Sequence, residues 1–222
     1  MRSSQLDAGG TILEPKAWSA SHAAAMFIMW WVMTVAMMIP SASPAVLTFA
    51  ATTRKLRNRA NAYVPTGLFL AGYLAIWGVF GWAATIFQWG LEQSGLMSAA
   101  MFTPDSKLAG ALFIGAGLYQ LSGFKQRCLR HCQEPHTYFN GNWRQGPFGA
   151  LSLGMAHGGF CLGCSRFLMA LLFVGGILNV FWITGLAAYV FLEKYLRHGS
   201  LLSIVAGCVL TCWGMLVMVT TW

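Results

Sequence analysis

Six cysteines form three close pairs in the sequence, and each pair lies in or beside a long apolar segment. The pairs are Cys128/Cys132, Cys161/Cys164 and Cys208/Cys212. Thiols in such surroundings can be small hydrophobic side chains in a packed core, a redox couple, or ligands of a soft metal ion. The chemistry open to this chain depends on which of these roles the cysteines have.

The string HGGFCLGC at 157–164 contains three donors that share one face of a predicted helix. His157, Cys161 and Cys164 are spaced i, i+4 and i+7. At a rise of about 1.5 Å per residue from Pro147, His157 lies roughly 15 Å deep, near the middle of a bilayer. Imidazole and thiolate bind copper, zinc and iron, and thiolate prefers soft ions. These residues predict a buried metal site, unless they are only core packing with His157 bonded to a neighbouring helix.

A second group of donors lies on a predicted polar cytoplasmic loop. Cys128 and Cys132 would share a face of a short helical turn, and Pro135 would let His136 fold back toward them. Cysteine pairs at this spacing with a nearby histidine occur in zinc sites. This pattern indicates an inner metal site. Alternatively, the basic residues in this segment could be only the charges that keep the loop on the cytoplasmic side.

Two further segments could supply donors to the buried site. Cys208 and Cys212 lie one helical turn apart, at a predicted depth that matches Cys161. A methionine stripe runs along the first apolar segment, and Met33 is its member at matching depth. Thioethers bind Cu(I), and Zn(II) would need four ligands, so the donor set favours Cu(I) over Zn(II). Either group could instead be core filler.

Composition indicates that these donors are positioned by membrane helices. The chain has 222 residues, of which 57% are hydrophobic and 9% charged, whereas a soluble domain carries about a quarter charged residues. Pro40 and Pro44 interrupt the first apolar run and predict a kink or break there. The predicted fold is all-α, a single membrane domain (1–222) with six spans of about 20 apolar residues each: 22–42, 66–90, 107–124, 147–173, 177–195 and 200–220.

Basic residues concentrate in the loops after the first, third and fifth predicted spans. These residues are Arg54, Lys55, Arg57, Arg59, Lys125, Arg127, Arg130, Arg144, Lys194 and Arg197. By the positive-inside rule these loops face the cytoplasm, so both termini lie outside a bacterial plasma membrane. The excess of 14 basic over 6 acidic residues is then a topology signal and predicts no nucleic-acid binding.

Other motifs are less informative about chemistry. The Glu193–Lys194 pair, at the inner end of the fifth span, is expected to extend toward water. The first twenty residues contain charges and no apolar core of a cleavable signal peptide. No Ser/His/Asp group, phosphate loop or carboxylate pair predicts a hydrolase or NTPase, and the chain is not assigned to an enzyme class.

Several strings together resemble a bacterial family of predicted metal-binding integral membrane proteins that carries a domain of unknown function. They are MTVAMMIPSASP at 33–44, GLYQLSGFKQRCLRHC at 117–132, HGGFCLGC at 157–164, LEK at 192–194 and Gly199. The family motif usually continues CLGC with a cysteine and a tryptophan. Ser165 and Arg166 stand there in this chain, so a ligand role for that third cysteine is absent. The resemblance implies a membrane protein that binds metal.

Three functions remain open from the sequence. The first is copper handling or cofactor delivery, with a metal donor or acceptor protein as partner. The second is an accessory subunit of a larger membrane complex. The third is a thiol–disulfide oxidoreductase in which Cys161 and Cys164 pass electrons to a quinone. The third ranks lowest because Cys128 and Cys132 are predicted on the cytoplasmic side, where thiols stay reduced.

Overall fold

A computed structural model describes residues 18–56, 63–95, 106–142 and 146–220, which form helices and no strand. The helices are α1 (Ala20–Leu56), α2 (Tyr63–Gln93), α3 (Ser106–Leu121), α4 (Gly123–Gln133), α5 (Pro135–Asn142), α6 (Pro147–Ala170), α7 (Leu172–Gly175), α8 (Val180–Tyr195) and α9 (Gly199–Thr220). The expected all-α fold is confirmed for the described residues.

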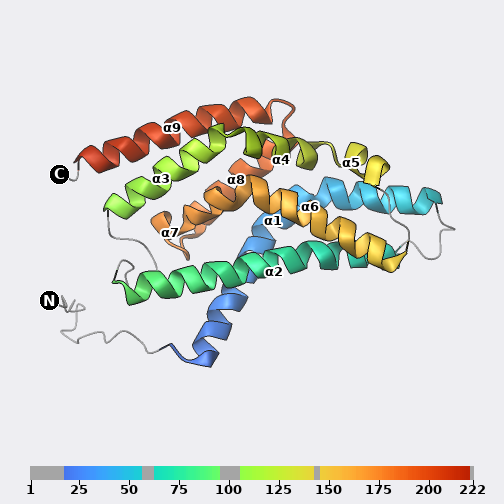
Figure 1. The fold of residues 1–222 in the computed structure, drawn as a ribbon, viewed down its shortest axis with the longest axis horizontal. Coiled ribbons are helices and arrows are strands. Elements are labelled where there is room, and N and C mark those ends of the chain that lie inside the picture. Colours follow the sequence, from blue (N-terminus) through green and yellow to red (C-terminus); the bar gives the residue numbers. More distant parts are fainter. Residues whose placement is uncertain (1–17, 57–62, 96–105, 143–145, 221–222) are drawn as a thin grey trace.

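Each of the six predicted spans corresponds to a helix, and four are confirmed as long and apolar enough to cross a membrane. The four stretches are Ala20–Lys55, Pro65–Gln93, Pro147–Gly175 and Gly199–Thr220. The other two, α3 and α8, have 16 residues each, or about 24 Å of helix against a hydrocarbon core of about 30 Å. Figure 1 shows α2, α3, α6 and α9 lying roughly along the long axis, whereas the first half of α1 crosses it steeply. Six crossings therefore remain a prediction.

Helix α1 bends but does not break. It is continuous from Ala20 to Leu56 with Pro40 and Pro44 inside it, and Figure 1 shows its direction changing partway along its length. Pro44 has no N–H to donate to the carbonyl of Pro40. The Ser43 hydroxyl donates to that carbonyl at 2.7 Å. A local side chain thus replaces one of the backbone hydrogen bonds that the prolines remove.

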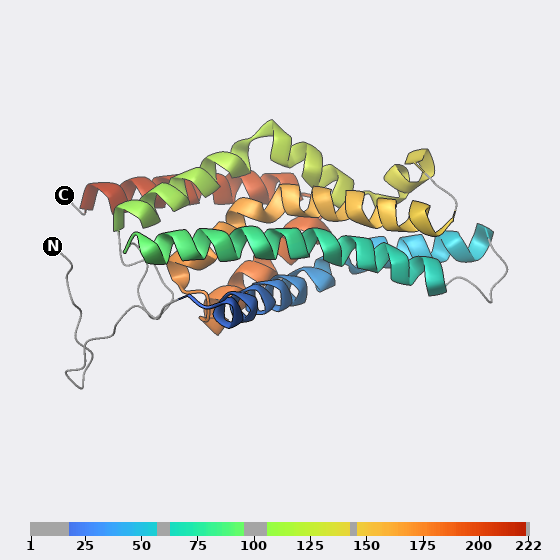
Figure 2. The same cartoon turned by 60° about the horizontal axis from the view of Figure 1, so that its bottom comes forward.

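The third predicted span ends earlier than expected and continues as a separate helix. Ser122 caps the start of α4, and its hydroxyl accepts from the backbone N–H of Lys125 at 3.3 Å. Figure 2 shows α3 and α4, in yellow-green, meeting at an angle. The prediction of a polar loop here is wrong, because Lys125, Cys128 and Leu129 are buried on one face of α4. That face packs against α6.

Helix α6 lies against both α2 and α4. A Cβ at Gly154 would collide with the backbone of Phe69 on α2. On the α4 side, a Cβ at Gly163 would lie 3.0 Å from the sulfur of Cys128. The small residues at these two positions allow α2 and α4 to approach α6 closely. These contacts hold the HGGFCLGC segment at the centre of the bundle.

Candidate soft-metal centre

Cysteines from α4 and α6 converge in the interior. The sulfurs of Cys132 and Cys164 lie 3.8 Å apart. Cys128 packs in the same buried cluster as Cys164, and Cys132 also interacts with the Cys161 side chain. From the sequence, these two pairs were predicted to form separate sites, whereas the structure brings them into one cluster. We refer to Cys128, Cys132, Cys161 and Cys164 as the thiol cluster.

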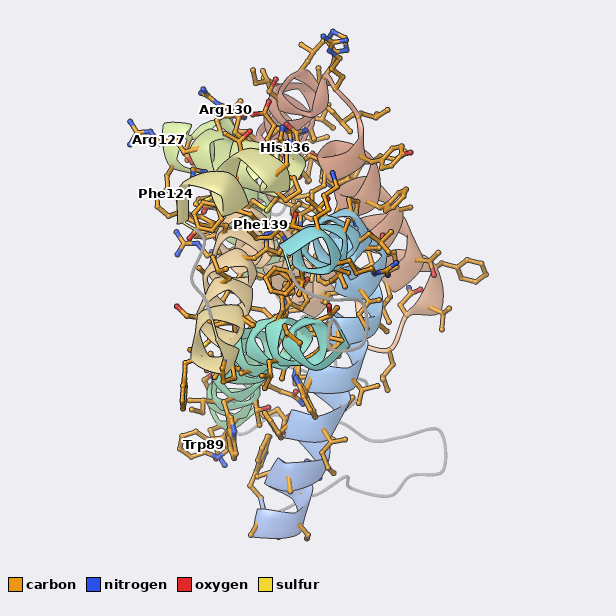
Figure 3. All side chains as sticks on the ribbon, turned by 90° about the vertical axis from the view of Figure 1, so that its right-hand side faces the viewer. Trp89, Phe124, Arg127, Arg130, His136 and Phe139 are labelled. Carbon is orange, nitrogen blue, oxygen red and sulfur yellow. The ribbon has the colours of Figure 1, made fainter. Side chains whose placement is uncertain are left out.

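The position of α4 on α6 is fixed by ring stacking beside the thiol cluster. The His131 imidazole stacks on Phe160 with centroids 4.3 Å apart and planes 13° from parallel. Its Nδ1 lies 2.8 Å from the Arg127 carbonyl oxygen one turn earlier. Figure 3 shows Arg127 and Arg130 on the outward side of α4. The arginines of α4 therefore face outward, whereas the cysteines face inward together with the buried Lys125.

Lys194 of α8 reaches the thiol cluster, which the sequence did not predict. Its ammonium donates to the Cys161 sulfur at 2.9 Å and lies 3.8 Å from the Met38 sulfur. The Tyr73 hydroxyl is 3.2 Å from the same Cys161 sulfur. Met38 and Tyr73 are fully buried. Met38 lies in the MTVAMMIPSASP string, so the family resemblance was the signal that could have located it.

The expectation that Glu193 and Lys194 extend to water is wrong, because Glu193 pairs with Lys125 and Lys194 contacts the Cys161 sulfur, both inside the bundle. Glu193 forms an ion pair with Lys125 of α4 at 2.5 Å, and both side chains are 0% exposed. The Tyr189 hydroxyl donates to the same carboxylate at 3.1 Å. Gln133 donates to the Glu193 backbone carbonyl at 3.0 Å. These bonds tie the end of α8 to α4, next to the thiol cluster.

His157 is buried one turn before Cys161 on α6. Its ring lies among the aromatic rings of Phe69, Tyr73 and Phe139, with centroids 6.1, 6.0 and 6.4 Å away. Phe139 comes from α5 and is labelled in Figure 3. His157 thus shares the predicted helix face with the thiol cluster and sits in an aromatic cage at its edge.

Other predicted donors are not brought to the thiol cluster. Cys208 and Cys212 are exposed, and with Trp213 they line an open apolar groove on α9. The cause is the rotation of α9, which turns its small residues, such as Gly207 and Gly214, toward α3. His136 is exposed on α5 and is labelled in Figure 3. Met33 is partly buried against the central hydrophobic core.

The thiol pair has a separation suited to one metal ion. Two sulfurs that each bind an ion at about 2.3 Å are 3.8 Å apart when the angle at the ion is about 110°. Within the described ranges, no three His, Cys, Asp or Glu side chains are already grouped as a metal site. The preformed part of the metal site is therefore the Cys132–Cys164 pair. The Met38 thioether and the Cys128 and Cys161 thiols lie around it.

The surroundings of the two cysteines of α4 raise the pKa of both thiols. Hydrogen bonding with Cys161 and Cys164, and then burial, raises the pKa of Cys132 well above its ordinary value. Burial raises the pKa of Cys128. A thiol must lose its proton to bind a metal ion. Metal binding at this cluster would therefore release protons.

The fold and the cluster define a helical protein with membrane-length apolar helices and a sulfur-rich interior site. A family model described as PpoB2, copper chaperone, matches residues 27–217. The match includes every residue of the thiol cluster, and the chain belongs to this family. Its description supports a copper-handling role with metal-handling partners, and it confirms a metal-related family. No curated protein and no solved structure matches the chain.

Proposed function

We propose that the protein is an integral membrane copper chaperone that holds Cu(I) between α4 and α6 and passes it to an acceptor protein. The observation that carries the proposal is the 3.8 Å separation of the Cys132 and Cys164 sulfurs. These residues come from different helices, so their approach is a property of the fold. The family description supports copper as the ion.

The thiol cluster provides more sulfur than Cu(I) needs at one time. Cys132 and Cys164 are the first ligands in this proposal, and Cys128 and Cys161 are alternatives within the same cluster. Soft thiolate and thioether donors select Cu(I), whereas Zn(II) in closed sites takes four ligands. Spare sulfur donors allow the ion to move by ligand exchange. Transfer to a thiolate of the acceptor then needs no energy source.

The membrane arrangement is part of the proposal. Six spans with both termini outside the bacterial plasma membrane agree with the basic residues at the ends of α1 and α8 and along α4. Among the described residues, Arg54, Lys55 and Arg197 mark this side. Arg57, Arg59 and Arg144, on which the charge argument also rests, lie outside the described residues. All of residues 1–222 form one membrane domain in this view.

Copper loading of cysteine variants tests the proposed site. The purified, reduced protein is loaded with Cu(I) without oxygen and analysed for metal content and for the metal–sulfur distance by X-ray absorption. Wild type should bind one Cu(I) ion with sulfur neighbours at about 2.2–2.3 Å. Cys132→Ser and Cys164→Ser should lose most of this binding.

Two exposed cysteines provide matched controls for this experiment. Cys208→Ser and Cys212→Ser make the same chemical change outside the thiol cluster, and both should load copper like wild type. Equal loading of all four variants would refute the site. A wild-type protein that binds no Cu(I) under these conditions would refute the proposed function.

Thiol–disulfide exchange is the second candidate. A disulfide requires the sulfurs at about 2.05 Å, so Cys132 and Cys164, now at 3.8 Å, could join after a small movement of α4. The Lys194 ammonium beside Cys161 favours a reactive thiolate there. Reduction of a quinone analogue in detergent, coupled to formation of a Cys132–Cys164 disulfide, would favour this function. An accessory-subunit role is compatible with either chemistry.

A further inference from the structure

Lys194 is a buried cation whose ammonium contacts two sulfur atoms. Its neighbour Glu193 is paired with Lys125, and within the described part of the chain no carboxylate forms an ion pair with Lys194. The ammonium instead lies 2.9 Å from the Cys161 sulfur and 3.8 Å from the Met38 sulfur. A buried charge without a partner is costly. Thiolates formed in the thiol cluster when it binds a metal ion would supply the compensating negative charge.

We propose that Lys194 determines which metal ions the thiol cluster accepts, by fixing one positive charge beside the ligands. The inference rests on the proposed copper site and deepens it. A fixed ammonium makes the cluster selective for a monovalent soft cation over a divalent one. Lys194 acts through charge and position and is not itself a ligand.

The charge balance of the occupied site gives the reason. Two thiolates, one Cu⁺ and the Lys194 ammonium sum to zero. Two thiolates, one Zn²⁺ and the same ammonium leave one net positive charge in a buried site, where unbalanced charge is expensive. Each thiol that binds an ion gives up its proton to solvent, and no electron is transferred. Zn²⁺ would need a third thiolate to reach the same balance.

A purely structural role for Lys194 predicts a different outcome. Its contacts also join α8 to α6 and α1, through Cys161 and Met38. If that linkage were its only function, removing it would loosen the cluster and weaken all metals alike. The ratio of affinities for monovalent and divalent ions separates the two roles.

The test compares metal affinities of the full-length protein in detergent by competition with chromophoric chelators. The variants are Lys194→Leu, which removes the charge without adding a sulfur donor, and Lys194→Arg, which keeps it. Arg197→Met removes an exposed charge at the end of the same helix and serves as the control. Cu(I) and Ag(I) are the monovalent probes, and Zn(II) and Cd(II) are the divalent ones.

Lys194→Leu should lower the Cu(I)-to-Zn(II) affinity ratio by roughly 100-fold or more, the scale for a unit charge within about 5 Å at an effective dielectric constant of about 20. Ag(I) should follow Cu(I), and Cd(II) should follow Zn(II). Lys194→Arg and Arg197→Met should keep the wild-type ratio. If Lys194→Leu does not fold, Lys194→Gln removes the same charge while keeping a hydrogen-bond donor.

Two failures can be told apart. An unchanged ratio in the neutral variants, or equal weakening of all four ions, overturns the role of Lys194 while the copper site stands. A wild-type protein without Cu(I) affinity overturns the proposed function itself.

Discussion

The buried ion pair between Lys125 and Glu193 gives the most direct prediction about stability. Both side chains are 0% exposed and 2.5 Å apart, so Lys125→Met leaves a carboxylate buried without its cation. Breaking a buried pair on one side costs about 3–5 kcal/mol. For a chain of this size, 1 kcal/mol corresponds to about 2–4 °C of Tm. Lys125→Met should therefore lower the Tm in detergent by roughly 6–20 °C.

The double variant Lys125→Met/Glu193→Leu is the control, because it removes both charges and leaves no unpaired ion. Replacing a buried pair with apolar residues is often neutral or stabilising, so this variant should recover most of the lost Tm. Thermal unfolding followed by circular dichroism measures both effects. A single variant as stable as wild type, or a double variant less stable than the single one, would refute this account of the ion pair.

Three further results are expected. Gly154→Ala should sharply reduce the yield of folded protein, because the new Cβ would collide with the Phe69 backbone. Gly159→Ala is the control and should be tolerated, because the space around Gly159 is open. Comparable yields of the two variants would contradict the close packing of α2 on α6. Mild oxidation should link Cys132 to Cys164, detected by mass spectrometry of peptides, and leave Cys208 and Cys212 unlinked; the opposite pattern would refute the described cluster. A phosphatase fused after residue 222 should be active because the C-terminus is predicted outside, and activity only in cytoplasmic reporters would exclude that topology.

The helices were predictable because each needs only a long apolar segment. The HGGFCLGC face also followed from helical spacing alone. The link between Cys132 and Cys164 did not, because it depends on α4 being a helix with a buried face. The charges of GFKQRCLRHC predict a loop, and only the Ser122 cap and the contact at Gly163 show otherwise.

The burial of Lys194 and the exposure of Cys208 were missed for a common reason. A basic residue at the end of a membrane helix normally reaches water, and nothing in the local sequence signals that Lys125 will neutralise the adjacent Glu193. Cys208 was predicted as a donor from its depth in the membrane, which follows from its position along the helix. Whether Cys208 faces the bundle depends on the rotation of α9 about its axis, which is set by glycine contacts with α3. Depth alone does not predict that rotation.

The division of the thiol cluster between α4 and α6 has a consequence for partner recognition. Helix α6 lies in the bundle core, whereas α4 is a short helix held by a cap, a stacked ring, an ion pair, the Gln133 hydrogen bond and the packing of one face. A metal ion bound between α4 and α6 would hold the two helices together and stabilise the docked position of α4 by mass action. An acceptor could then distinguish the filled from the empty protein by how firmly the outer, arginine-bearing side of α4 is held, without touching the metal first.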